Sequence, residues 1–74
     1  MRILINGEAK ECEEGIPLSA LIELLELPPQ RIAIELNREV VRRADWNTIV
    51  LRNEDRLEIV HFVGGGSGFS SIRK

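Results

Sequence analysis

The sequence predicts an α+β fold in which one main helix packs across one face of a mixed β-sheet. Three observations support this prediction: strand-like alternation of apolar and polar residues near both ends of the chain, one intervening segment with helical spacing, and turn signals between these pieces. With 74 residues the chain forms a single domain that buries only about 60% of its unfolded surface, so we expect modest stability.

The first predicted element is a β-hairpin. Residues 1–6 alternate like a strand, with two isoleucines on one face. Asn6 and Gly7 follow, and this pair is a strong hairpin-turn signal because both residues adopt positive φ at low cost. The chain then returns through residues 8–13 as a second, mostly polar strand.

A helix is predicted over residues 16–27. Its apolar residues recur at i, i+3, i+4 and i+7, the spacing that buries one stripe of a helix. The stripe consists of Leu18, Leu21, Ile22 and Leu25. Pro17 suits the first turn of such a helix, and the Pro28-Pro29 pair is expected to end it because proline lacks the N–H that a helix interior needs.

The second half of the chain predicts further strands joined by short loops. In chain order they cover residues 32–36, 40–41 and 56–63, with a short apolar piece at 49–51 and turns near Asn37-Arg38 and over 53–55. Trp46, the only tryptophan, lies in a loop between strands, where we expect it to cap the core. If the first and last strands pair in parallel, the result is the β-grasp, or ubiquitin-like, fold. The periodicity predicts the elements but not their pairing.

Glycine is concentrated directly after the last predicted strand. Four of the six glycines lie in the segment Gly64-Gly65-Gly66-Ser67-Gly68. Because such a segment has no strand-like alternation and every glycine lowers the cost of irregular backbone, we expect regular structure to end at Val63.

The composition argues against several classes of function. The formal net charge of -2 disfavours nucleic-acid binding, which calls for a strongly basic face. No uninterrupted apolar run exceeds three residues and no signal peptide is expected, so we predict no membrane association and a cytoplasmic location. With one cysteine, Cys12, and one histidine, His61, we predict no metal site, no catalytic residue and no cofactor bound by this chain.

The last strand also predicts a docking surface. Its first apolar residues alternate toward the core, but Val60 and Phe62 then fall on the opposite face. This pattern indicates either a bulge or an apolar patch that the monomer leaves uncovered. A patch beside a glycine tail suits partner binding, and we assign to it Leu4, Val60, Phe62 and Val63.

Three stretches of the sequence resemble the thiamine-biosynthesis sulfur carrier proteins, the ThiS family. Residues 37–46 (NREVVRRADW) are similar to a family block that reads Asn, three residues, Val, Pro-Arg, two residues and Trp. Residues 51–60 resemble the block that follows, and residues 61–66 (HFVGGG) resemble the family's end. The resemblance spans residues 1–66, and it is the tryptophan block together with the glycine end that makes it specific. The chain departs from the family pattern at Arg42, where Pro is usual, and at Glu54, where Gly is usual.

The resemblance implies a ubiquitin-like sulfur carrier rather than an enzyme. An adenylating, ubiquitin-activating-like partner would use ATP to adenylate the carboxylate of Gly66. A sulfur donor protein carrying a cysteine-derived persulfide would then displace AMP to give a thiocarboxylate, and thiazole synthase would take this sulfur into the thiazole ring of thiamine. Gly64 and Gly65 would form the tail, because an extended end without Cβ atoms enters a channel too narrow for side chains.

The chain departs from the family most at its end, since family members stop at the last glycine and this chain continues for eight residues beyond Gly66. These residues leave Gly66 in an unreactive peptide bond and displace the terminal carboxylate by up to about 27 Å. We therefore divide the chain into a β-grasp domain (1–63), a flexible glycine tail (64–66) and a disordered, removable extension (67–74), and we predict a processing peptidase that cuts after Gly66. The alternative is a flexible linker with an inert tail.

Two other functions stay open on the sequence alone. The same carrier chemistry serves other products, such as molybdopterin, a thiolated tRNA base or another sulfur-containing metabolite. Molybdenum-cofactor carriers tend to be longer and lack the tryptophan block, which favours thiamine, whereas proteolytic maturation fits some non-thiamine pathways. From a different class, the chain could be a ubiquitin-like interaction module whose glycines only tether a partner-binding sheet.

Overall fold

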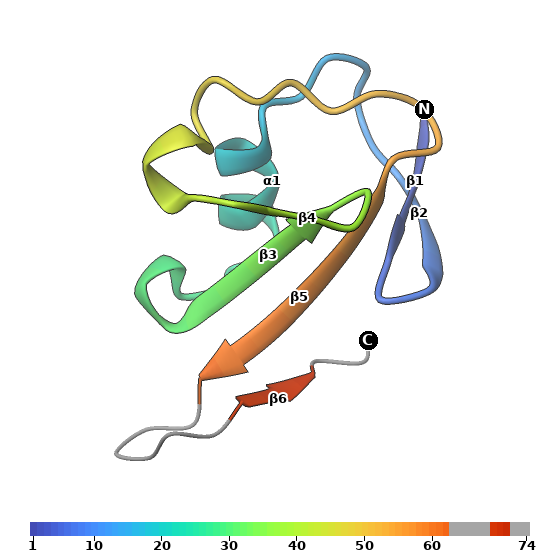
Figure 1. Ribbon diagram of the computed structural model, residues 1–74. Coiled ribbons are helices and arrows are strands. Elements are labelled where there is room, and N and C mark those ends of the chain that lie inside the picture. The colour runs from blue at the N-terminus through green and yellow to red at the C-terminus, as the bar shows by residue number, and fades with distance from the viewer. Residues whose placement is uncertain (63–68, 72–74) are drawn as a thin grey trace.

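The computed structural model describes residues 1–62 in full and residues 69–71 by their main chain. Within these ranges six strands form one mixed sheet, and helix α1 (Leu18–Leu24) packs across one face of it (Figure 1). The strand order is β2-β1-β5-β3-β4, with β6 beside β5. This is the β-grasp layout, so the predicted α+β fold with one main helix across a mixed sheet is confirmed.

The strands are short, as expected for a domain of this size. They are β1 (Arg2–Ile5), β2 (Glu8–Glu11), β3 (Ile32–Leu36), β4 (Glu39–Val41), β5 (Arg56–Phe62) and β6 (Phe69–Ser71). Two 3₁₀ turns, η1 (Pro29–Arg31) and η2 (Arg43–Asp45), lie before β3 and after β4. β1 and β5 pair in parallel, and the other neighbours pair antiparallel. The spacing of apolar residues did not predict which strands pair, and the structure shows that β1 pairs with β5.

In two β-hairpins of the sheet, the first residue of the turn is an asparagine with positive φ. Asn6 and Gly7 have φ values of 50° and 86°, and Asn37 and Arg38 have φ values of 51° and 73°. Positive φ at both central residues is what a type I′ turn requires, and the twist of this turn matches that of the strands it joins. The turns predicted at these two positions are confirmed.

Helix α1 is shorter than predicted. It covers Leu18–Leu24 instead of residues 16–27, and Pro17 is its N-cap rather than part of its first turn. Three residues of the predicted stripe are buried, whereas Leu25 follows the helix and is half-buried. The helix therefore ends before Pro28-Pro29, and the prediction that this pair stops it is wrong.

The helix ends instead through a left-handed residue. Glu26 has φ of 57°, its N–H donates to the carbonyl of Glu23, and the N–H of Leu27 donates to the carbonyl of Ile22. These two bonds define the Schellman motif, which satisfies the last carbonyls of a helix and usually has glycine at the left-handed position. Because a glutamate stands there, the local sequence carries no signal for this ending.

Replacing Glu26 with glycine is expected to raise the free energy of unfolding by about 0.5–1 kcal/mol, because a left-handed φ strains any residue that has a Cβ. Glu23→Gly is the matched control, since Glu23 lies within α1 and glycine there is expected to lower stability by about 1 kcal/mol. Urea denaturation followed by Trp46 fluorescence measures both changes. Equal losses in the two variants would contradict the assignment of strain to Glu26.

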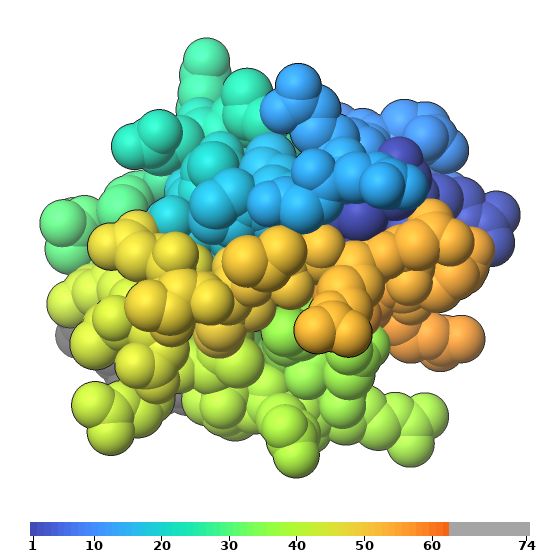
Figure 2. Space-filling model, turned by 90° about the horizontal axis from the view of Figure 1, so that it is seen from above, coloured from blue at the N-terminus to red at the C-terminus, as the bar shows by residue number. Residues whose placement is uncertain are grey.

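The core lies between α1 and the inner face of the sheet. Its buried residues are Ile3, Ile5, Ile16, Leu18, Leu21, Ile22, Ile32, Ile34, Trp46, Leu51, Leu57 and Ile59. Trp46 is 4% exposed and its indole N–H donates to the carbonyl of Val41 at 3.2 Å, which confirms that it caps the core. Figure 2 shows the segment between β4 and β5 (yellow to orange) lying between the N-terminal residues (blue to cyan) and the β3-β4 region (green).

Regular structure continues beyond Val63, contrary to prediction. Residues Phe69–Ser71 form β6, which pairs antiparallel with the end of β5 (Figure 1). The disorder expected over 67–74 therefore does not hold for these three residues. Their pairing with β5 is not predicted, because a short Gly/Ser-rich segment has no strand-like alternation. Val63, the glycine tail (64–66) and the rest of the extension lie outside the described residues, so the flexible tail and the removable extension stay predictions.

Candidate functional site

The face of the sheet opposite α1 is the candidate partner-binding surface. Since Leu57 and Ile59 of β5 are buried toward the helix, alternation directs Val60 and Phe62 to the opposite face, and the same argument places Leu4 of β1 there. Leu4 and Val60 are half-buried, and Phe62 is 37% exposed. The described part of the domain thus leaves these apolar groups incompletely covered, and their role in binding stays a prediction.

The fold gathers apolar residues from three strands on this face. Ala33 of β3 lies opposite Val60 of β5, and Val40 of β4 lies opposite Glu35 of β3. A shallow hollow of about 330 Å³ lies among them. Val40 is 73% exposed, the largest value among the exposed large apolar residues of the described chain. We name Ala33, Val40, Val60 and Phe62 the open-face patch.

Ala33 and Val40 were not predicted as members of this surface. Alternation within β3 and β4 already separates each of them from its inward-facing neighbours. That signal does not say which other strand lies alongside. Only the register between β3 and β5 brings Ala33 to Val60.

Leu4 shares the open face but not the patch. It lies opposite Arg56, four residues before Val60 on β5, which is about 13 Å along a strand. Its strand neighbour Arg2 forms an exposed ion pair with Glu54 at 2.8 Å, so the surroundings of Leu4 are charged. The structure therefore separates Leu4 from Val60 and Phe62, which were predicted to form one surface with it. Val63, the fourth predicted member, lies outside the described residues.

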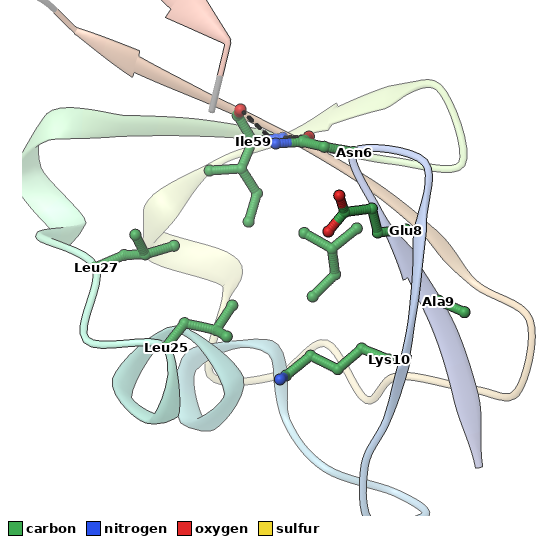
Figure 3. A pocket seen from close by; sticks show the side chains of 8 residues that line it. Asn6, Glu8, Ala9, Lys10, Leu25, Leu27 and Ile59 are labelled. Atoms are coloured by element: carbon green, nitrogen blue, oxygen red, sulfur yellow. Dashed lines mark hydrogen bonds between the residues drawn. The ribbon is translucent and has the colours of Figure 1, made fainter. Parts of the chain in front are cut away.

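A second hollow, of about 170 Å³, lies between the β1-β2 hairpin and the C-terminal end of α1 (Figure 3). Its lining consists of Ile5, Asn6, Glu8, Ala9, Lys10, Leu25, Leu27 and Ile59. The buried side-chain amide of Asn6 forms two hydrogen bonds with the main chain of β5. Its Oδ1 accepts the N–H of Ile59 at 2.8 Å, and its Nδ2 donates to the carbonyl of Ile59 at 3.4 Å. The lining is otherwise mostly hydrocarbon, with exposed charges only at Glu8 and Lys10.

The potentially reactive side chains lie apart from one another. Cys12 is half-buried beside the N-terminus, where its N–H donates to the carbonyl of Met1. His61 is half-buried on β5, opposite Ile32. Among the described side chains, no group of three or more His, Cys, Asp and Glu residues is arranged to hold a metal ion. No helix in the same part of the chain is long and apolar enough to cross a membrane.

The route to the predicted reactive end starts on β5. Phe62 is the last residue of that strand, and Gly66 follows four residues later. Four extended residues reach about 13 Å. The predicted tail residues Gly64, Gly65 and Gly66 lie outside the described residues, and Phe62 is the last described residue before them.

Comparison with known proteins matches this chain to one family and its structures. The model of the ThiS family matches residues 3–66. The sulfur carrier protein ThiS of Bacillus subtilis is 35% identical over 63 residues, covering 84% of this chain and 96% of the relative. The crystal structure of the thiamine biosynthesis protein ThiS of Geobacter metallireducens superimposes with a TM-score of 0.79 at 26% identity, covering 89% of this chain and all of that one.

Longer relatives contain a segment similar to this chain. A thiazole synthase of Magnetococcus marinus is 41% identical over 66 residues, which are 89% of this chain and 20% of the relative. A thiazole synthase of Paramagnetospirillum magneticum is 34% identical over 67 residues, which are 90% of this chain and 21% of the relative. The chain thus spans about a fifth of the length of these two relatives.

Proposed function

Because this chain belongs to the ThiS family of small sulfur carrier proteins, we propose that it carries sulfur as a thiocarboxylate on Gly66 and donates it for formation of the thiazole ring of thiamine. The observation that carries the proposal is that the family match runs through the glycine end and stops at Gly66. The relatives named thiazole synthase, which contain a segment similar to this chain, support thiazole synthase as the recipient of the sulfur.

In this proposal the chemistry takes place in partner proteins. An adenylating enzyme binds ATP, and the carboxylate of Gly66 attacks the α-phosphorus, which forms an acyl-adenylate and releases pyrophosphate. The terminal sulfur of a donor protein's persulfide then displaces AMP, and a thiol frees the thiocarboxylate by reducing the resulting disulfide. Gly64 and Gly65 let the carboxylate enter the active site because their lack of Cβ atoms suits a narrow channel.

The domain would supply the docking surface for these partners. The open-face patch is apolar, incompletely covered and located where β5 leads toward the tail. A partner that covers the patch removes its hydrocarbon from water, which favours association. Docking on this face would hold the body outside the partner's active site while about 13 Å of extended chain reaches inward.

Val40→Asp is expected to weaken binding to the adenylating enzyme at least about tenfold, because it places a charge in the apolar centre of the contact. Val50→Asp is the matched control, since Val50 is 52% exposed but lies in the segment before β5 rather than on the open face. Isothermal titration measures both affinities, and urea denaturation checks that stability changes by less than about 0.5 kcal/mol. Equal weakening by the two substitutions would argue against the open face as the docking surface.

The extension predicts a maturation step. In the 74-residue chain Gly66 has no free carboxylate, so a peptidase must cut between Gly66 and Ser67 before activation. A chain ended at Gly66 is therefore expected to support ATP–pyrophosphate exchange by the adenylating enzyme, and the 74-residue chain is expected to show none. Exchange with neither chain, while the same enzyme activates an authentic ThiS protein, would reject the carrier function in favour of an interaction module.

A further inference from the structure

One edge of β5 is covered in three consecutive sections, and each section is supplied by a different part of the chain. At the start, the main chain of β1 binds it: the N–H of Leu4 donates to the carbonyl of Asp55, and the N–H of Asn6 donates to the carbonyl of Leu57. In the middle, the side chain of Asn6 binds both main-chain groups of Ile59 (Figure 3). At the end, β6 pairs with the last three residues of the strand.

β6 can pair with the end of β5 because β1 is too short to cover that part of the edge. The N–H and carbonyl of Ile59 both point to this edge, and in a strand the groups two residues on point the same way, so those of His61 also face this edge. His61 lies opposite Ser70 of β6. On its other edge β5 is covered by β3 as far as Ile32, which also lies opposite His61. Main-chain groups at a sheet edge that no longer strand covers, such as those of His61 beyond the end of β1, are a site for strand addition.

β6 is a weakly held occupant of this site. It has three residues and pairs with one strand, so few hydrogen bonds hold it. Short pieces at a sheet edge open locally at a small fraction of the free energy of global unfolding. A longer extended segment that presents its own main chain would therefore replace β6 without unfolding the domain.

We propose that residues 69–71 act as an intramolecular inhibitor on the β5 edge at His61, and that removal of 67–74 opens this edge to an extended main-chain segment of the adenylating enzyme. The inference rests on the proposed function, which supplies that partner. His61 precedes Gly66 by five residues, or about 17 Å of extended chain. A partner strand paired with His61 would fix the direction in which the glycine tail leaves the domain. Cleavage would then create the carboxylate and open its docking edge in one step.

Two proline substitutions separate the strand pairing from the presence of the extension. Ser70→Pro removes the N–H that faces His61 and is expected to release β6. Ser71→Pro is the matched control, because alternation points the N–H of Ser71 away from β5.

In native-state hydrogen exchange the His61 amide is expected to exchange at least about tenfold faster in Ser70→Pro and in the chain ended at Gly66 than in the 74-residue chain and in Ser71→Pro. Equal exchange rates in all four chains would overturn the inhibitory pairing.

Binding to the adenylating enzyme tests the second half of the proposal. Ser70→Pro is expected to bind at least about tenfold more tightly than the 74-residue chain or Ser71→Pro, although none of the three has a free Gly66 carboxylate. In the complex with the chain ended at Gly66, the His61 amide is expected to become protected again. Rapid exchange of this amide in the bound chain, or equal affinity of Ser70→Pro and Ser71→Pro, would show that the edge has no part in docking.

The two proposals fail in different assays. Loss of ATP–pyrophosphate exchange in the chain ended at Gly66 would reject the carrier function, whereas hydrogen exchange in the free chains reports on β6 alone. Far-UV circular dichroism and Trp46 fluorescence are expected to be the same for all four chains, because β6 lies outside the core formed by α1 and the inner face of the sheet.

Discussion

Replacing Asn6 with alanine is expected to lower the free energy of unfolding by about 2–4 kcal/mol, since it leaves two buried main-chain groups of Ile59 without partners. Asn6 is 4% exposed, and its amide both accepts from and donates to Ile59. In a domain of this size, each 1 kcal/mol corresponds to about 4–8 °C in Tm, so the shift is large. Urea denaturation followed by Trp46 fluorescence measures the change.

Asn37→Ala is the matched control for this prediction. Asn37 also has a positive φ in a hairpin turn, and its Oδ1 also accepts a β5 main-chain N–H, that of Arg56, at 3.0 Å. Asn37 is exposed, so water replaces the lost amide and the expected loss is below about 1 kcal/mol. Both substitutions place alanine at a left-handed φ. The difference between their losses in free energy of unfolding therefore measures the effect of burying the asparagine's hydrogen bonds. Equal losses would mean that the turn conformation, and not the contact with Ile59, accounts for the effect.

Gly65→Val in the chain ended at Gly66 is expected to reduce the rate of adenylation at least about a hundredfold, because a branched side chain next to the terminal residue displaces the carboxylate from the attacking position. ATP–pyrophosphate exchange at saturating ATP measures the rate. The stability of the domain is expected to stay unchanged, since the tail follows the last strand of the core.

Gly64→Val provides the comparison along the same tail. It lies one residue farther from the carboxylate, so a smaller loss, within about tenfold, is expected if the channel narrows toward the reacting atoms. Valine tolerated at both positions would show that the glycines act as a spacer and that the adenylating site does not need a tail without side chains.

Most of the fold was predictable because its signals are local. The turns at Asn6-Gly7 and Asn37-Arg38 follow from which residues tolerate positive φ, and the core role of Trp46 follows from a single large ring beside polar loops. The turn over 53–55 was predicted, but the left-handed residue within it and the helix end were less predictable. In each of these two places a glutamate has a left-handed φ: 57° at Glu26 and 71° at Glu54. At the position of Glu54, ThiS proteins usually have glycine. Their conformations are imposed by surrounding contacts and not by their own preference.

The candidate site was predictable only in part. Alternation along β5 indicated that Val60 and Phe62 face away from the core, and the structure places them so. Alternation could not indicate that Ala33 and Val40 adjoin Val60, or that Leu4 lies about 13 Å from it along β5. These relations depend on which strands are neighbours and in which register, and both are set by the packing of the whole sheet.

The sequence by itself determined the kind of protein: its spacing of apolar residues specifies one helix and several strands, and its tryptophan block and glycine end identify the family. Only the tertiary structure decided how the edge of β5 is completed, with the Asn6 amide at Ile59 and residues 69–71 beyond it. For the Asn6 contact the physical reason is distance along the chain. Asn6 and Ile59 are 53 residues apart, and no local preference of either residue encodes a hydrogen bond that forms only after the sheet has assembled.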